Sequence, residues 1–276
     1  MHEAHDPGRR RWLARAAAAA AGAAAWPLHA EEGEALARIR ARGSIVVGVY
    51  QDMPPFHVAG QGIDIDVARA LAARLGVGLS LLPFAAGETM EDDLRNMVWR
   101  GHYLGWGPAD VLLHVPMEMD AGPKVRIVAP YYRERLALAV RRDALPAVDT
   151  LGALRGQRIA VAGRSLAGWL LIAADGGALT ATLSTGFADG TGAARALREG
   201  AVAAAAGLAS ELESVLSDDP RFAIQSLPSS RVRAQGWAVG CAVKKESGDL
   251  AAALQAAMPA TQLAEIFARG GVHWQV

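Results

Sequence analysis

The chain has 276 residues, of which 52% are hydrophobic and 20% are charged. This composition is typical of a globular protein and excludes a disordered chain, a coiled coil and a collagen-like fibre. The 28 basic and 28 acidic residues cancel, so the net charge gives no reason to expect a nucleic-acid partner. The length allows one large domain or two of medium size.

Residues 1–30 have the pattern of an export signal. Arg9, Arg10 and Arg11 form a positive start, and an Ala-rich apolar stretch follows over residues 12–26. That stretch is too short to span a membrane as a helix; the alternative is a surface helix. The order Arg-Arg-x-aromatic-Leu resembles a twin-arginine signal. We therefore expect a periplasmic mature chain, cut near residue 30, with no membrane anchor.

Apolar runs alternate with helical patterns through the rest of the chain. Strands are expected at residues 44–50, 79–84, 109–115, 126–129, 136–140, 158–162, 179–184, 202–206 and 237–243. Helices are expected at residues 63–75, 88–99, 150–154, 190–199, 210–216, 249–258 and 261–268, with a further one after 163–165. This alternation predicts α/β layers with a mostly parallel sheet. The single cysteine, Cys241, cannot form an internal disulfide.

Six segments, taken in order, resemble the family 3 periplasmic solute-binding proteins. They include Met-Pro-Pro-Phe at 53–56 and Ala-Pro-Tyr-Tyr at 129–132, and the others lie at 43–49, 62–68, 109–111 and 154–161. The resemblance implies an α/β, two-lobed type II fold whose lobes are joined by two hinge crossover strands. Lobe 1 would comprise residues 31–138 and 237–276, and lobe 2 residues 139–236. Ligands of such folds bind between the lobes, and closure is a hinge motion.

A narrower resemblance lies in residues 93–105 and 109–116. These segments are similar to the branch associated with quinoprotein alcohol dehydrogenases, the MxaJ- and XoxJ-like proteins of methanol oxidation. That branch implies a non-enzymatic accessory of a dehydrogenase, with no cofactor of its own. One alternative is an ABC transporter receptor that delivers a small solute to a permease. Another is a dehydratase-like enzyme on the same fold, which would need a paired acid and base that the sequence does not show.

Two departures from the family argue against an amino-acid ligand. Amino-acid-binding members carry an arginine shortly before the Pro-Tyr segment, and here Ala121 stands in that register. They also carry an acid after the strand of lobe 2, whereas residues 200–207 contain none. A zwitterion buried here would lack both charge-assisted hydrogen-bond partners, and burying its charges unpaired would cost several kcal/mol. The sequence therefore favours an apolar or weakly polar small molecule, or no ligand.

The expected cleft residues follow the strands of both lobes. They are Tyr50, Asp52, Phe56, His57, His114, Pro116, Tyr131, Arg164 and Ser165. His57, His102 and His114 have no second ligand at zinc-like spacing, so no metal site is expected. His114 lies at a strand end, where open α/β sheets bind ligands. Ser165 begins a helix, where it either caps the helix or helps Arg164 to bind an anion.

Three aromatic side chains share a glycine-rich segment that lies outside the alternation of strands and helices. They are Trp99, Tyr103 and Trp106. Such residues either pack on lobe 1 or form a partner surface, where Trp and Tyr are enriched. The sequence leaves both interpretations open, and the partner would be the dehydrogenase or a permease.

Overall fold

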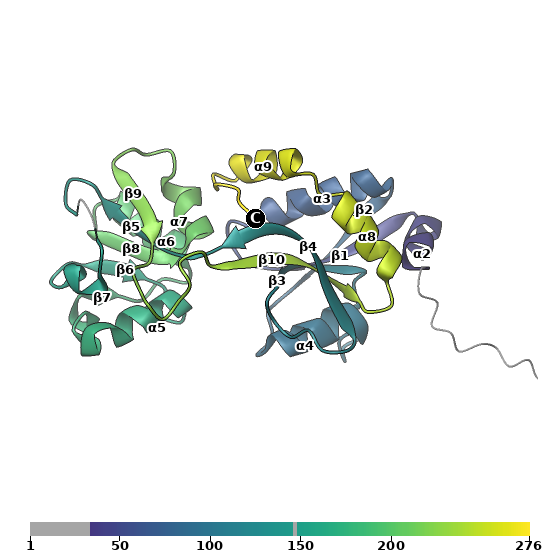
Figure 1. Ribbon diagram of the computed structural model, residues 1–276, viewed down its shortest axis with the longest axis horizontal. Coiled ribbons are helices and arrows are strands. Elements are labelled where there is room, and N and C mark those ends of the chain that lie inside the picture. Colours follow the sequence, from purple (N-terminus) through teal and green to yellow (C-terminus); the bar gives the residue numbers. More distant parts are fainter. Residues whose placement is uncertain (1–33, 146–147) are drawn as a thin grey trace, which may run out of the picture. The chain divides into compact units, whose positions relative to one another are not determined.

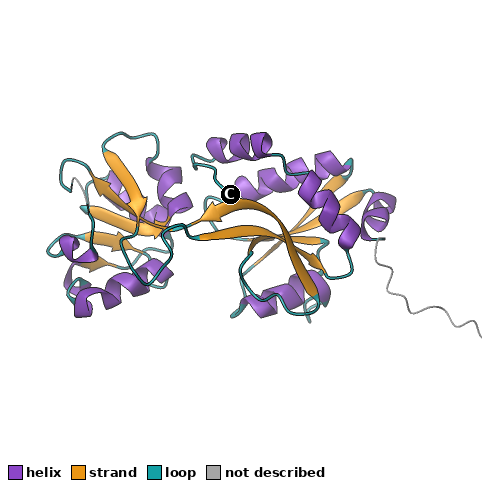
Figure 2. Cartoon of the chain, in the orientation of Figure 1, coloured by secondary structure: helices purple, strands orange, loops and turns teal. Residues whose placement is uncertain are grey.

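The computed structural model describes residues 34–145 and 148–276, so the expected export signal at 1–30 lies outside the described residues. The described chain forms two five-stranded sheets with helices packed on them (Figures 1 and 2). In the first sheet the strand order is β2-β1-β3-β10-β4, and in the second sheet it is β7-β6-β8-β5-β9. The expected α/β class is confirmed.

The strands of the first sheet are β1 (Ser44–Tyr50), β2 (Gly78–Phe84), β3 (Val111–Pro116), β4 (Val125–Glu134) and β10 (Trp237–Lys244). Its helices are α2 (Ala35–Arg42), α3 (Ile63–Leu75), α4 (Met90–Leu94), the π-helix η1 (Arg95–Trp99), α8 (Gly248–Ala256) and α9 (Ala260–Arg269). One face buries side chains against α3, α8 and α9, and the opposite face packs on α4 and η1. Alternate residues of each strand therefore enter different cores.

The strands of the second sheet are β5 (Leu136–Arg141), β6 (Ile159–Val161), β7 (Leu183–Ser184), β8 (Ala204–Leu208) and β9 (Phe222–Ser226). Its helices are α5 (Leu166–Ala173), α6 (Gly190–Arg198) and α7 (Ala209–Leu216), with 3-10 turns η2 (Leu151–Leu154), η3 (Ala174–Gly177) and η4 (Thr180–Thr182). Helix α5 covers one face, while α6 and α7 cover the other. Small residues such as Ala137, Ala160 and Ala205 let α6 and α7 pack closely on that face.

The prediction of a mostly parallel sheet holds for strand direction, but each sheet is mixed: four strands run in one direction and the fifth runs against them. Strand β1 is parallel to β2 and β3, but β10 is antiparallel to both β3 and β4. In the second sheet β6 is parallel to β7 and β8, but β5 is antiparallel to β8 and β9. The antiparallel strands β5 and β10 each come directly from the other sheet. A strand that enters from the other sheet does not follow a βαβ crossover. It is the βαβ crossover that makes a strand parallel to its neighbour, so β5 and β10 are free to run antiparallel.

The chain passes from one sheet to the other at Arg135. Strand β4 ends at Glu134 in the first sheet, and β5 begins at Leu136 in the second. The chain returns to the first sheet in β10, which starts at Trp237. The chain therefore leaves the first sheet at Arg135 and re-enters it at Trp237.

Several local expectations differ from the structure. The expected helix at 88–99 is a short α-helix continued by a π-helix, and the expected strand at 179–184 is a 3-10 turn followed by two strand residues. Sequence reasoning missed α2 and the edge strand β9. Within the described ranges, no helix is long and apolar enough to cross a membrane.

Candidate functional site

The carboxyl ends of β1 and β3 form the first candidate site region. The two strands are parallel neighbours, with Val47 opposite Val111 and Gly48 opposite Leu112. The carboxyl ends of parallel strands share one edge of a sheet, which is where open α/β sheets bind ligands. Asp52 follows β1, and His114 lies two residues before the end of β3. The expected site residues of the first sheet therefore gather at one edge.

His114 belongs to a group of polar side chains at this edge. Tyr131 donates its hydroxyl hydrogen to Asp64 Oδ1 over 2.7 Å. His114 Nδ1 lies 3.3 Å from Asp64 Oδ2 and 3.5 Å from the Tyr131 hydroxyl. Asp64 is fully buried in the first turn of α3, where the helix dipole stabilises its charge. Burial, then the neighbouring Asp64 carboxylate, raises the pKa of Tyr131, which remains a hydrogen-bond donor.

His114 is the member of this group that reaches solvent. Its side chain is 12% exposed, and the Phe56 ring packs edge-on against it at 4.1 Å between centroids. Within residues 34–145 and 148–276, its Nε2 atom has no hydrogen-bond partner. Its backbone also has a φ of 63°, which is strained for a residue with a side chain. Strain of this kind concentrates at functional sites, and it holds the imidazole at the sheet edge.

Two other predicted site residues, His57 and Tyr50, make hydrogen bonds within the fold. His57 Nδ1 donates to the Tyr50 carbonyl over 2.8 Å, and Gly60 donates its N–H to His57 Nε2 over 3.1 Å. The Tyr50 hydroxyl donates to Asp93 Oδ2 over 3.0 Å. Both side chains are buried, as are Phe56 and Tyr131. These residues shape the loop after β1, while the solvent-accessible positions are Asp52, His114 and Pro116.

The loop after β1 is held close to the start of α3. Gly62 has a φ of 130°, and a β-carbon there would lie within 2.8 Å of the Pro55 carbonyl oxygen. The N–H groups of Ile63 and Asp64 bond the carbonyls of Pro55 and Phe56. Only glycine permits this approach, which places Asp64 under the sheet edge.

The second sheet has its own edge, where β6 leads into α5. The Ser165 hydroxyl accepts a hydrogen bond from the Gly168 N–H over 3.1 Å and donates to the Ala162 carbonyl over 2.7 Å. Ser165 is therefore the N-cap of α5. The neighbouring Arg164 is exposed, and its guanidinium has no partner within the described part of the chain.

Sequence reasoning missed a half-buried acid in the second sheet region. Residues 200–207 contain no acid, but Glu211 in α7 folds back onto this stretch. Its Oε2 accepts the Leu208 N–H over 2.8 Å, and a β-carbon on Gly207 would lie 2.9 Å from the same oxygen. Burial raises the pKa of Glu211 to about 7. The Glu at the third helical position of α7 was the available signal, because this is where a capping acid stands.

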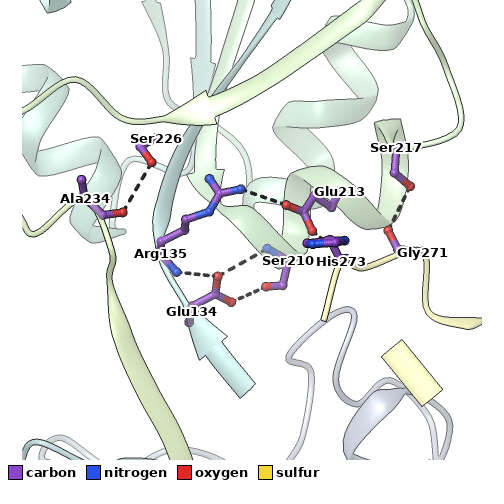
Figure 3. A network of polar contacts seen from close by, with 9 residues as sticks. All are labelled: Glu134, Arg135, Ser210, Glu213, Ser217, Ser226, Ala234, Gly271 and His273. Atoms are coloured by element: carbon purple, nitrogen blue, oxygen red, sulfur yellow. Dashed lines mark hydrogen bonds and ion pairs between the residues drawn. The ribbon is translucent and has the colours of Figure 1, made fainter. Parts of the chain in front are cut away.

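A polar network surrounds the point where the chain changes sheet (Figure 3). Glu134 Oε1 accepts the Arg135 N–H over 2.9 Å, and the Ser210 hydroxyl donates to the other Glu134 oxygen. Arg135 Nη2 pairs with Glu213 Oε1 at 3.0 Å, and the His273 N–H donates to Glu213 Oε2 over 2.9 Å. The network therefore joins the end of β4, helix α7 and the C-terminal segment.

The three aromatic residues of the glycine-rich segment have different environments. Tyr103 is 87% exposed and Trp99 is 36% exposed. Trp106 is half-buried and stacks on His102, with ring centroids 4.1 Å apart and planes 10° apart. Trp106 packs against the core, whereas Tyr103 and its neighbour Leu104, which is 68% exposed, present apolar surface to solvent.

Among the described residues, no group of three or more His, Cys, Asp or Glu side chains could hold a metal ion. Cys241 is buried, and burial, then the Asp64 charge, raises the pKa of its thiol.

The sequence matches no family model, and it matches no curated protein. Solved structures do match the fold. An ancestral cationic amino acid solute-binding protein superposes with a TM-score of 0.65 at 19% identity, covering 86% of this chain and 97% of that one. An amino acid ABC transporter substrate-binding protein from Streptococcus pneumoniae, bound to L-arginine, gives 0.57 at 20% identity, covering 86% and 97%. The VFT2 domain of BvgS from Bordetella pertussis gives 0.56 at 19% identity, covering 89% and 99%.

These matches define the class of fold. The chain has the α/β, two-lobed fold of the solute-binding proteins, with one mixed five-stranded sheet in each lobe. Among the structures that share it are binding proteins and a histidine kinase sensor domain. At these identities the likeness establishes the fold, while the ligand and partner depend on this chain's own residues.

Proposed function

We propose that this chain is a periplasmic solute-binding protein that delivers a small solute to an ABC transporter. The observation that supports this most is the strand-end group at His114, in a fold shared along nearly its full length with such receptors. A polar edge that reaches solvent at His114 and is held by a buried Asp64–Tyr131 pair is a preorganised binding surface. The edge after β6, with its exposed Arg164, would supply the second half of the site.

The ligand that we propose is not a free amino acid, although two of the matched proteins are described as amino-acid receptors. Position 121 is alanine, which supplies no guanidinium for a carboxylate. Glu211 stands near Gly207, but its Oε2 already accepts the Leu208 N–H. A small, weakly polar solute with a hydrogen-bond donor for His114 Nε2 fits these residues better, because Nδ1 faces the Asp64 carboxylate and carries the ring proton.

A thermal-shift screen tests this function. A solute at about 100 times its dissociation constant should stabilise the protein by about 2.7 kcal/mol, while arginine and other amino acids give no shift. His114→Ala should weaken the binding of that solute about tenfold or more, because it removes a hydrogen bond made at the sheet edge. His102→Ala is the matched control, since His102 stacks on Trp106 away from this edge. Micromolar binding of an amino acid would contradict the ligand assignment, and unchanged solute binding by His114→Ala would contradict the site.

A second candidate function is that of an accessory to a quinoprotein dehydrogenase, as the narrower sequence resemblance implies. The exposed side chains of Tyr103 and Leu104 favour it, because protein partners bind aromatic surface of this kind. None of the solved structures reported above is such an accessory. Co-purification with a quinoprotein dehydrogenase would favour this candidate over the transport receptor.

Export to the periplasm is part of the main proposal. The Arg-rich start of the chain supports it, but residues 1–30 lie outside the described residues. The twin-arginine route stays a prediction from Arg9, Arg10 and the apolar stretch that follows.

A further inference from the structure

A cavity lies in the second sheet region, at the opposite end of β5 from the change of sheet at Arg135. It has a volume of about 300 Å³. Its lining residues come from the end of β5, the end of α6 and the start of β9: Arg141, Arg142, Asp143, Arg198, Arg221 and Phe222. The volume reaches the lower end of the range of small-ligand sites, about 300–1,000 Å³.

The charges around this cavity do not cancel. Arg141 pairs with Asp143 through two hydrogen bonds of 3.0 and 2.8 Å, and Arg221 pairs with Asp219. Hydrogen bonds and charge from Asp143 raise the pKa of Arg141, and the positive charge of Arg221 opposes that shift. The two ion pairs therefore lie close to one another. Four arginines stand against two aspartates, which leaves an excess of two positive charges.

The excess belongs to Arg142 and Arg198. Arg142 Nε donates to the carbonyls of Pro220 and Phe222, over 3.2 and 3.1 Å. These bonds hold the guanidinium in place without neutralising it, and they leave both terminal nitrogens free. Arg198 makes one long bond of 3.4 Å, from Nη1 to the Val215 carbonyl. Within residues 34–145 and 148–276, neither guanidinium forms an ion pair, although the charge of Arg198 reaches Asp219 and helps to lower the pKa of that carboxyl.

Guanidinium groups that are not paired with carboxylates are suited to binding a phosphate group. Arg presents a planar fork of N–H donors that matches phosphate oxygens in pairs, and such bonds are about twice as strong as neutral ones. A multivalent phosphate would neutralise the excess charge and accept bonds from several directions. Phe222 is buried beneath the Arg221 guanidinium, 5.4 Å from its ring centroid, and stiffens that wall.

We propose that the cavity lined by Arg141, Arg142, Arg198 and Arg221 binds a phosphate-bearing anion, at a site separate from the strand-end edge at His114. Such an anion could be a free pyrophosphate or a phospholipid headgroup, since both present negatively charged phosphate oxygens. The site is independent of the solute-binding function, because none of its residues lies at the edge that carries His114 or Arg164.

Calorimetry of the purified protein with sodium pyrophosphate tests the proposal. We expect a dissociation constant of about 1 mM or lower in dilute buffer, weakening as salt screens the arginines. Arg198→Gln/Arg221→Gln should weaken binding at least about tenfold. Arg155→Gln is the matched control, because Arg155 is also an exposed arginine paired with an aspartate, Asp175, in the same sheet region. The control should bind pyrophosphate within about twofold of the wild type.

A second arm identifies the source of the phosphate. Vesicles of phosphatidylcholine with added phosphatidylglycerol replace pyrophosphate in a sedimentation assay, with the same variants. Binding to these vesicles alone, lost in Arg198→Gln/Arg221→Gln, supports the site and assigns it to a headgroup. Absence of binding to both probes up to about 10 mM overturns the proposal, as does equal binding by the double variant. Melting curves of each variant establish that the fold is retained.

Discussion

At the scale of single residues, buried and half-buried acids are the main feature that the sequence did not reveal. Burial raises the pKa values of Glu134, Glu211 and Glu213, although hydrogen bonds oppose the shift at each. Each of these acids binds its proton more tightly in the folded chain than in the unfolded chain. The folded state therefore loses stability as rising pH removes those protons.

Glu211→Gln tests this linkage. The pKa of Glu211 is raised from 4.5 to about 7, so its contribution to unfolding free energy falls between these pH values and is flat above them. Glutamine has no such proton, and the variant should lose about 2 kcal/mol less than the wild type between pH 5 and pH 8. Urea denaturation at both pH values measures the difference. Glu88→Gln, at an exposed position, should leave the pH dependence unchanged; an identical slope in Glu211→Gln would refute the assignment.

At the scale of elements, neighbouring residues of the segment between η1 and β3 have different environments. Trp106 stacks on His102 and packs against the core below η1, which anchors the segment. Tyr103 lies at its exposed turn, where the Gly105 N–H bonds the His102 carbonyl over 2.9 Å. The sequence presented packing and partner binding as alternatives, and the structure packs Trp106 while it leaves Tyr103 exposed.

Two alanine variants distinguish these roles. Trp106→Ala should lower the unfolding free energy by about 2 kcal/mol, because removal of the half-buried indole leaves a cavity that the surrounding side chains fill only in part. Tyr103→Ala should change it by less than about 0.5 kcal/mol, since its side chain contacts mostly solvent. If a quinoprotein dehydrogenase is the partner, Tyr103→Ala should also weaken a pulldown about tenfold or more. A large loss of stability in Tyr103→Ala would show that the exposed turn is packed, and an unaffected pulldown would remove it as a partner surface.

At the scale of the whole molecule, the network around Arg135 stabilises the point where the chain leaves the first sheet. Glu213 is buried, and it receives both the Arg135 guanidinium and the His273 N–H. The same helix also donates the Ser210 hydroxyl to Glu134 (Figure 3). Helix α7 therefore binds the crossing segment and the C-terminal segment together.

Arg135→Met measures how much this network contributes. Loss of the guanidinium leaves the Glu213 carboxylate buried with one partner fewer, which should lower the unfolding free energy by about 3 kcal/mol. Arg155→Met removes an exposed ion pair with Asp175 and should lower it by no more than about 1 kcal/mol. Chemical denaturation of both variants gives the comparison. Similar losses would mean that the Arg135–Glu213 pair behaves as an ordinary surface pair.

The sequence by itself determined the elements whose signals are local. The apolar run at Ser44–Tyr50 and the helical period of Ile63–Leu75, closed by Gly76, have the bounds that the sequence predicts. The cap at Ser165 was one of two local alternatives, and the structure shows it directly. These features depend on residues within a few positions of one another, so the nearby sequence is sufficient to specify them.

Only the tertiary structure decided the features that join distant residues. The antiparallel direction of β10, the approach of Glu211 to Gly207 and the burial of Asp64 beneath His114 belong to this group. The arginines of the phosphate cavity likewise come from three segments separated by tens of residues. Strand direction and side-chain burial depend on which segments meet when the cores close. Many chain arrangements satisfy the same local pattern, and the packing of the two cores selects one of them.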